Sequence, residues 1–166
     1  LFTIQALASL QNPTMFDCQV ASDNADGWLI VTNPQSVLPA SPEFLASIEA
    51  AGKPVVTIGY RERSIRCRSV VIDNRQAIKD AMSHLIENHG HRRIAFVGAT
   101  EHLDLIERFE GYKEALREHG IDYDEQLFFQ TNSALRRGGV SAAAAMLERG
   151  IDFTAIVAAT DLNAFG

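Results

Sequence analysis

The feature that most constrains the fold of this sequence is an alternation of short apolar runs with longer amphipathic segments. Turn residues enclose the apolar runs, as Asp26-Gly27 and Asn33-Pro34 enclose residues 28–31, which is typical of buried strands. Strands that alternate with helices of about 10–15 residues predict parallel sheets covered on both faces, an α/β fold. The predicted strands are residues 28–31, 54–58, 69–72, 93–98, 127–129 and 154–159.

The clearest predicted helix covers residues 75–89. Its apolar residues share one helical face, Asp73 can cap its start and Gly90 can end it. Further helices are predicted at residues 42–51, around the helical spacing of Leu105 and Leu116, and at 139–149, whereas the opening stretch is expected to form a short helix up to about Leu10. The stripe of the 75–89 helix consists of Ala77, Ile78, Ala81, Met82, Leu85 and Ile86.

Composition and charge exclude several classes of protein. The sequence is 46% hydrophobic and 22% charged, as in an ordinary globular protein, and it has neither an apolar run of membrane-spanning length nor a visible export signal. Two distant cysteines, Cys18 and Cys67, suggest no disulfide framework, and a reducing cytoplasm fits best. A formal net charge of −6 is the wrong sign for binding phosphates, so we expect DNA contact only through a module outside these residues.

Common catalytic motifs are absent from the sequence. It has no GxGxxG after a strand, no GxxxxGK[ST], no GxSxG and no HExxH, so we expect no enzyme, no cofactor and no metal site. Gly138-Gly139 is interpreted as a helix start rather than a phosphate loop, and His89-Gly90-His91 as a helix stop rather than a metal pair. The arginine-rich stretch 61–68 is interpreted as a solvated loop, with an interface or an anionic effector as the alternative.

Two charged residues follow strand ends, where α/β folds bind their ligands. Asp161 comes after the apolar run 154–159, and its carboxylate can accept hydrogen bonds from hydroxyls or amines. Arg108 lies one turn into the helix that follows residues 93–98, and its guanidinium can donate twice to a ligand oxygen. Taken alone, each of these residues fits a surface charge or helix cap better than a ligand contact.

Several ordered motifs resemble the ligand-binding domain of LacI/GalR-type transcription regulators. Val71-Ile72-Asp73-Asn74 and the run from Gly90 to Gly98 match the best-known part of that domain. Residues 107–116, Glu-Arg-Phe-Glu-Gly-Tyr-Lys-Glu-Ala-Leu, resemble its next helix, and residues 155–166 resemble its later strand and turn. The resemblance extends from Asp26 to Gly166, and the first stretch matches poorly.

The resemblance implies a periplasmic-binding-protein-like fold of two doubly wound parallel-sheet lobes that close on a small polar metabolite, such as a sugar or nucleoside. By analogy, residues 1–72 belong to the first lobe and 73–166 to the second. Arg108 and Asp161 match residues that contact the effector, and Asn132 and Tyr60 are weaker candidates from loops that align less well. A homodimer is also implied, because such regulators read two half-sites on DNA.

Some features depart from the family pattern. The usual first strand and helix are hard to find, and the family's last strands and its helix-turn-helix are absent, so we expect an incomplete chain. The junction Asn88-His89-Gly90-His91 is one residue longer than usual, which resembles the sensor domains of histidine kinases and diguanylate cyclases. Such a sensor domain and a transport solute-binding protein therefore remain alternatives to a transcription regulator.

Overall fold

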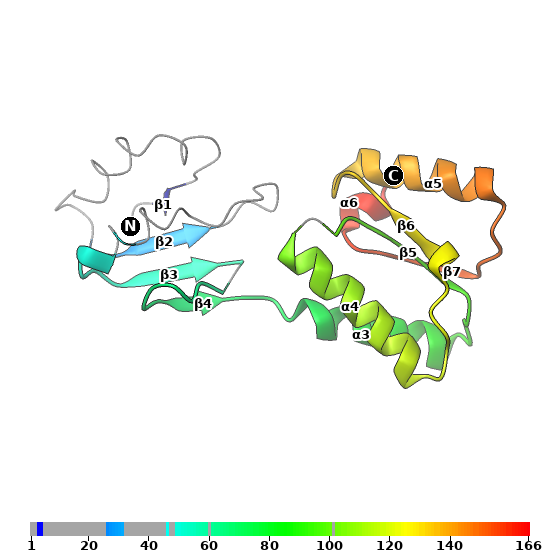
Figure 1. Ribbon diagram of the computed structural model, residues 1–166, viewed down its shortest axis with the longest axis horizontal. Coiled ribbons are helices and arrows are strands. Elements are labelled where there is room, and N and C mark those ends of the chain that lie inside the picture. The colour runs from blue at the N-terminus through cyan, green and yellow to red at the C-terminus, as the bar shows by residue number, and fades with distance from the viewer. Residues whose placement is uncertain (1–2, 5–25, 32–45, 47–48, 60, 101) are drawn as a thin grey trace. The chain divides into compact units, whose positions relative to one another are not determined.

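The chain forms two compact units, Leu1–Ile72 and Asp73–Gly166 (Figure 1). Both contain only parallel strand pairs among the described residues, which confirms the prediction of parallel sheets. The computed structural model describes residues 3–4, 26–31, 46, 49–59, 61–100 and 102–166.

The first unit contains a four-stranded sheet in the order β1-β2-β3-β4. Residues 3–4 pair with β2 as a strand, so the helix expected up to about Leu10 is wrong at these two positions. The last strand begins and ends earlier than the predicted 69–72, and most of the predicted helix 42–51 lies outside the described residues. The strands are β1 (Thr3–Ile4), β2 (Trp28–Val31), β3 (Val55–Ile58) and β4 (Arg68–Val70).

The second unit is built on a three-stranded sheet in the order β6-β5-β7. Helices precede and follow the strands as the sequence pattern predicts, with two short additions: a π-helix at His84–Asn88 and a 3₁₀ turn at Glu125–Leu127. The elements are α3 (Asn74–Ser83), β5 (Ile94–Gly98), α4 (Leu103–Glu118), β6 (Phe128–Gln130), α5 (Arg136–Arg149), β7 (Ala155–Ala158) and α6 (Asp161–Ala164).

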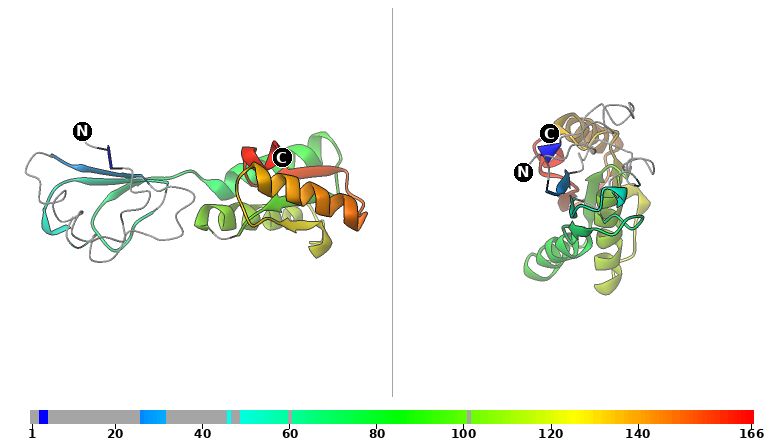
Figure 2. Two further views of the ribbon diagram at one scale, coloured as in Figure 1. Left: turned by 90° about the horizontal axis from the view of Figure 1, so that it is seen from above. Right: turned by 90° about the vertical axis from the view of Figure 1, so that its left-hand side faces the viewer.

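Strand β5 is buried along its whole length because helices cover both faces of the sheet. Its side chains alternate between the faces, as successive residues of a strand must. Ile94 and Phe96 join the core beneath α3 and α4, whereas Ala95 and Val97 join the core beneath α5. Figures 1 and 2 show α5 on one side of the sheet and the α3–α4 pair on the other. Because helices cover both faces, polar ligands can reach the sheet most readily at the ends of its strands.

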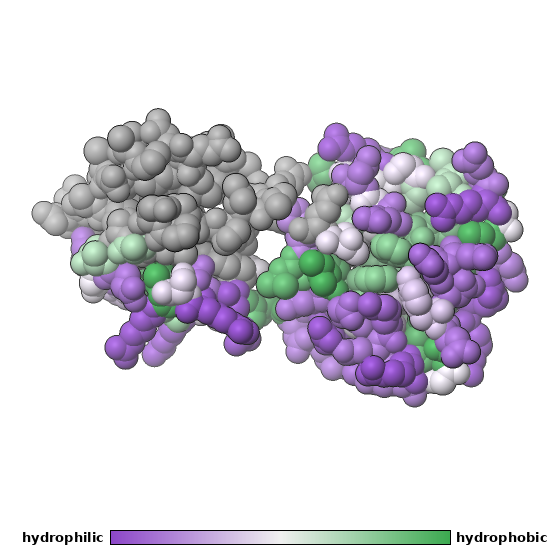
Figure 3. All heavy atoms as spheres, in the orientation of Figure 1, coloured by the Kyte–Doolittle hydropathy of each residue, from purple (hydrophilic) through white to green (hydrophobic). Residues whose placement is uncertain are grey.

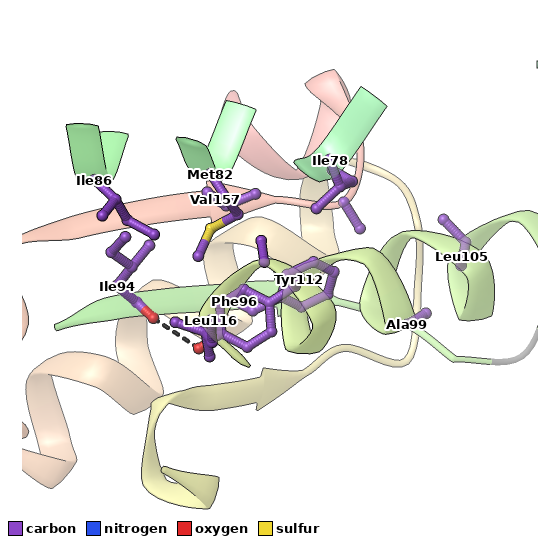
Figure 4. Packing of buried hydrophobic residues seen from close by; sticks show 12 residues of the cluster. Ile78, Met82, Ile86, Ile94, Phe96, Ala99, Leu105, Tyr112, Leu116 and Val157 are labelled. Atoms are coloured by element: carbon purple, nitrogen blue, oxygen red, sulfur yellow. Dashed lines mark hydrogen bonds between the residues drawn. The ribbon is translucent and has the colours of Figure 1, made fainter. Parts of the chain in front are cut away.

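The larger core is centred on Tyr112 and Phe96, both with no exposed surface (Figure 4). The Tyr112 hydroxyl donates to the Ile94 carbonyl at 2.8 Å, so its one polar group is satisfied inside the core. Burial, followed by the nearby Tyr123 and Asp124, raises the pKa of Tyr112 far above its ordinary value. The phenol is therefore a neutral donor in the physiological range.

The observed caps, buried faces and start positions of the helices can be compared with those that the sequence predicts. Asp73 caps α3 as predicted, because its carboxylate accepts from the Gln76 N–H at 3.0 Å. Ile78 is buried on the predicted stripe, but Ala77 and Ala81 are exposed, so the buried face is narrower than predicted. Helix α5 begins at Arg136, not at residue 139.

Charged side chains cover the outer faces of α3 and α4. Ion pairs join the two helices, Arg75 with Glu114 and Lys79 with Glu118, the latter at 2.6 Å. Figure 3 shows hydrophilic side chains over most of the visible face of this unit. Exposed pairs of this kind contribute about 0–1 kcal/mol each, so buried apolar contacts are the main source of stability.

Candidate functional site

The candidate site lies at the carboxyl edge of the second unit's sheet. The three strands are parallel and end at Gly98, Gln130 and Ala158, so their following loops start from the same edge. In open parallel sheets this edge is where ligands bind, because helix and strand ends leave polar groups there. Both charged residues singled out by the sequence are at this edge.

Arg108, on α4, is half-buried and tied to two other elements. Its Nε donates to Asn74 Oδ1 at 2.9 Å, and its Nη1 donates to the carbonyl of Ala159 just after β7. Asn74 itself is 6% exposed and donates to Glu107 Oε2 at 3.3 Å. A guanidinium has five donors, so this tether fixes its direction and leaves it able to donate to another acceptor.

Close packing of α3 on α4 brings Asn74 to Arg108. At Gly111 the two helices approach so closely that a Cβ would overlap the backbone carbonyl of Arg75. Glycine at this position therefore lets the start of α3 reach the residues one turn earlier on α4. Asn74 belongs to a motif that carries the family resemblance, but nothing in the sequence indicates that it holds Arg108, since an asparagine after a capping aspartate looks like any exposed turn residue.

Asp161 is the first residue of α6, three positions after the last residue of β7, and is exposed. Its carboxylate accepts from the N–H of the next residue, Leu162, at 2.9 Å. The helix cap is supplied by Thr160, whose hydroxyl accepts from the Asn163 N–H at 3.1 Å. This edge of the sheet therefore carries an exposed acceptor, the Asp161 carboxylate, as well as a tethered donor, the Arg108 guanidinium.

Asn132 is exposed in the loop that leads from β6 to α5. Buried Asn163 anchors this loop by donating to the carbonyls of Ser133 and Leu135 at 3.0 and 2.9 Å. The Thr160 hydroxyl donates to the Ala134 carbonyl at 2.8 Å and adds a second anchor. Both anchors come from the turn after β7, a link that the sequence did not indicate. Tyr60, the fourth predicted ligand residue, lies outside the described residues.

Gly138 and Gly139 have a packing role in the first turn of α5. Both are buried, and a Cβ would overlap the Ser133 carbonyl at Gly138 and the Asn163 carbonyl at Gly139. The two glycines thus let α5 pack against the loop and α6. The predicted helix is found, but its predicted start lies three residues too late.

The arginine-rich stretch 61–68 lies in the first unit, and its four arginines are exposed. Glu62 organises part of it by accepting from the N–H groups of Arg63 and Ser64, each at 2.7 Å. Burial opposes ionisation there, but the hydrogen bonds from Ser64 and Arg63 lower the pKa of Glu62 overall.

Within the described parts of the chain, no three His, Cys, Asp or Glu residues surround a metal position, and no helix has the length and hydropathy to cross a membrane.

A parallel α/β fold with polar side chains at the carboxyl edge of a sheet is typical of ligand-binding domains. A family model described as "Periplasmic binding proteins and sugar binding domain of LacI family" matches residues 14–166. The chain belongs to this family.

Similar proteins are bacterial transcriptional regulators. The chain is 37% identical to the HTH-type transcriptional regulator AscG of Escherichia coli K12 over 72% of this chain and 35% of AscG. It is 33% identical to the HTH-type transcriptional regulator CelR of Thermobifida fusca over 86% of this chain and 41% of CelR. The chain therefore spans well under half the length of these curated relatives.

Solved structures of regulators share the fold. The crystal structure of the E. coli transcriptional repressor ascG superposes with a TM-score of 0.68 at 33% identity, covering 86% of this chain and 50% of that one. A CelR–cellobiose complex superposes with a TM-score of 0.69 at 32% identity, covering 90% of this chain and 45% of that one. The predicted periplasmic-binding-protein-like fold and the LacI/GalR resemblance are thereby confirmed.

Proposed function

We propose that this chain is the effector-sensing part of a LacI/GalR-type transcription regulator and binds a small sugar without converting it chemically. The observation that carries the proposal is the tethered Arg108 guanidinium, which bonds to the Ala159 carbonyl two residues before the exposed Asp161. Hydroxyl-rich ligands offer both donors and acceptors, so they suit an edge that carries both a tethered guanidinium and an exposed carboxylate. The CelR–cellobiose complex supports sugars as the class of ligand.

In this proposal Arg108 donates to a ring or hydroxyl oxygen, and Asp161 accepts from a sugar hydroxyl. Asn132, in the loop after β6, is an additional contact in this proposal, and Tyr60 is carried over as one from the sequence resemblance alone. The carboxylate of Asp161 has only a local hydrogen bond, so binding a hydroxyl there breaks no tertiary contact. Its exposure also leaves it hydrated until the ligand arrives, which avoids a buried unpaired charge.

The rest of the regulator lies outside this sequence in our proposal. DNA contact comes from a separate module, the protein acts as a homodimer, and it works in the cytoplasm. The relatives named above are transcriptional regulators, which favours this output over a kinase, a cyclase or a transport protein. An effector would then change DNA affinity by favouring one of two conformations of the whole regulator.

The proposal is tested by calorimetry of the intact protein against cellobiose and a panel of mono- and disaccharides, with product analysis of every ligand that binds. Asp161→Ala is expected to weaken binding about 10- to 150-fold, the equivalent of about 1.5–3 kcal/mol for a hydrogen bond to a charged group. Arg108→Lys should also weaken binding, because an ammonium ion cannot reproduce a guanidinium's two directed tethers.

Asp122→Ala is the matched control, since Asp122 is an exposed aspartate in the segment before β6, away from the carboxyl edge. It should leave affinity unchanged. Unchanged affinity in Asp161→Ala, together with lost thermal stability, would reduce Asp161 to a structural residue of α6. Conversion of a bound sugar into product would contradict the binding-only function.

A further inference from the structure

The helix that begins with α3 ends in an unusual turn. Residues His84–Asn88 form a π-helix, in which each turn contains one residue more than an α-helical turn would. Ile86, within this turn, is buried in the core.

The π turn brings His84 and His89 together, five residues apart in sequence. Their Nε2 atoms are 3.1 Å apart, and their ring centroids are 4.7 Å apart with the planes at 74°. A hydrogen bond directed along the axes of both rings would place the two ring centroids farther apart than this. At least one ring is therefore turned away from the line that joins the two nitrogens, and both residues are exposed to solvent.

We propose that His84 and His89 form a surface site for a divalent transition-metal ion that prefers nitrogen ligands, such as Cu²⁺, Ni²⁺ or Zn²⁺. Two nitrogens 3.1 Å apart, each about 2.1 Å from one ion, subtend about 95° at that ion. This angle lies between the cis-octahedral and tetrahedral values. Since no group of three protein ligands converges in the described part of the chain, water fills the other positions and the ion exchanges readily.

Asn88 is positioned to orient the first ring. Its side-chain nitrogen Nδ2 lies 3.0 Å from His84 Nδ1, the nitrogen opposite the one that faces His89, so in this arrangement the amide donates to the ring. A metal-bound imidazole carries its proton on the other nitrogen and donates it to a neighbouring acceptor. In the proposed site the Asn88 amide is rotated by 180°, which places its oxygen toward Nδ1 as that acceptor and leaves Nε2 as the ligand atom. His91 lies nearby, with its ring centroid 6.2 Å from that of His89, but its Nδ1 is 3.1 Å from Thr154 Oγ1.

The test is calorimetric titration of the tag-free chain with CuCl₂, NiCl₂ and MgCl₂ in a non-chelating buffer at pH 7.5. One Cu²⁺ should bind per chain more tightly than Ni²⁺, and Mg²⁺ should give no binding, because it prefers oxygen ligands. His84→Ala and His89→Ala should each weaken Cu²⁺ binding at least about tenfold, and Asn88→Ala should weaken it about 10- to 100-fold.

His102→Ala is the matched control, because His102 precedes α4 and its side chain makes no cap hydrogen bond. It should leave Cu²⁺ affinity within about twofold. Circular dichroism of each variant establishes that the helices are retained. Absence of Cu²⁺ binding, or binding that survives both His84→Ala and His89→Ala in folded protein, would mean that the two imidazoles form only a neutral hydrogen-bonded pair.

Discussion

Replacing Asn163 by alanine tests how the turn after β7 holds the loop that carries Asn132. Asn163 is 4% exposed and donates to the carbonyls of Ser133 and Leu135. Its orientation is settled by these bonds, since the reversed amide would point an oxygen at two carbonyls. Both carbonyls keep another partner in the variant, the Thr131 hydroxyl on Ser133 and the Gly138 N–H on Leu135.

The expected loss is therefore the net value of two neutral hydrogen bonds, not the full cost of two unsatisfied carbonyls. At about 1 kcal/mol per bond, Asn163→Ala should lower the free energy of unfolding by about 2 kcal/mol. The loss in the free energy of unfolding should be slightly smaller than this, because the substitution also removes the buried Asn163 Oδ1, which has no partner among the described residues. The loss corresponds to about a 30-fold shift toward the unfolded state.

Urea unfolding followed by circular dichroism measures this difference. Asn132→Ala, an exposed amide on the same loop, is the control and should change stability by less than about 0.5 kcal/mol. Asn163→Asp should cost more than Asn163→Ala at pH 7, because a carboxylate would face two carbonyls without a proton to donate. Equal stability of Asn163→Ala and Asn132→Ala would refute the argument that Asn163 anchors the loop.

Two further changes probe helix packing and pH dependence. Gly111→Ala should lower the unfolding free energy by about 1–3 kcal/mol and lower Tm in a thermal melt, because its methyl would overlap the Arg75 carbonyl; an unchanged Tm would contradict close packing of α3 on α4. Hydrogen bonds that His119 donates, first to the Glu87 carboxylate and then to the Ala115 carbonyl, raise the pKa of His119. The stability that these bonds contribute is therefore full below pH 6.5 and is lost as pH rises through the folded-state pKa. Urea unfolding at pH values between 5.5 and 8.5 should show that the free energy of unfolding falls by less than about 1 kcal/mol as pH rises, and His119→Gln should not show this fall. An equal fall in His119→Gln would assign the pH dependence to other groups.

Local sequence signals were enough to predict the main elements of the second unit. The Asp73 cap, the buried Ile78 and the apolar strand β5 depend on neighbouring residues, and each is found where the pattern placed it. Arg108 and Asp161 could be assigned to the carboxyl edge because strand order along the chain fixes which loops start there.

Other features depend on contacts between distant residues and could not be predicted. The sequence places the start of the helix at Gly138-Gly139, yet α5 begins at Arg136 and both glycines lie within its first turn, with other backbone segments packed against them. Ala77 and Ala81 fit the apolar stripe but stay exposed, since only part of α3 faces α4 and the sheet. Asn74 and Asn163 gain their roles only when α4 and β7 come into place.

Strand order has a consequence for how the second unit forms during synthesis. Strand β5 leaves the ribosome first among the three strands, yet it lies at the centre of the finished sheet, with Ile94 paired to Ala155 across a long intervening segment. Closing that segment costs chain entropy before the pairing stabilises anything. A nascent chain that stops before Ala155 therefore has one bare edge on β5, open to unintended pairing with other chains until β7 emerges.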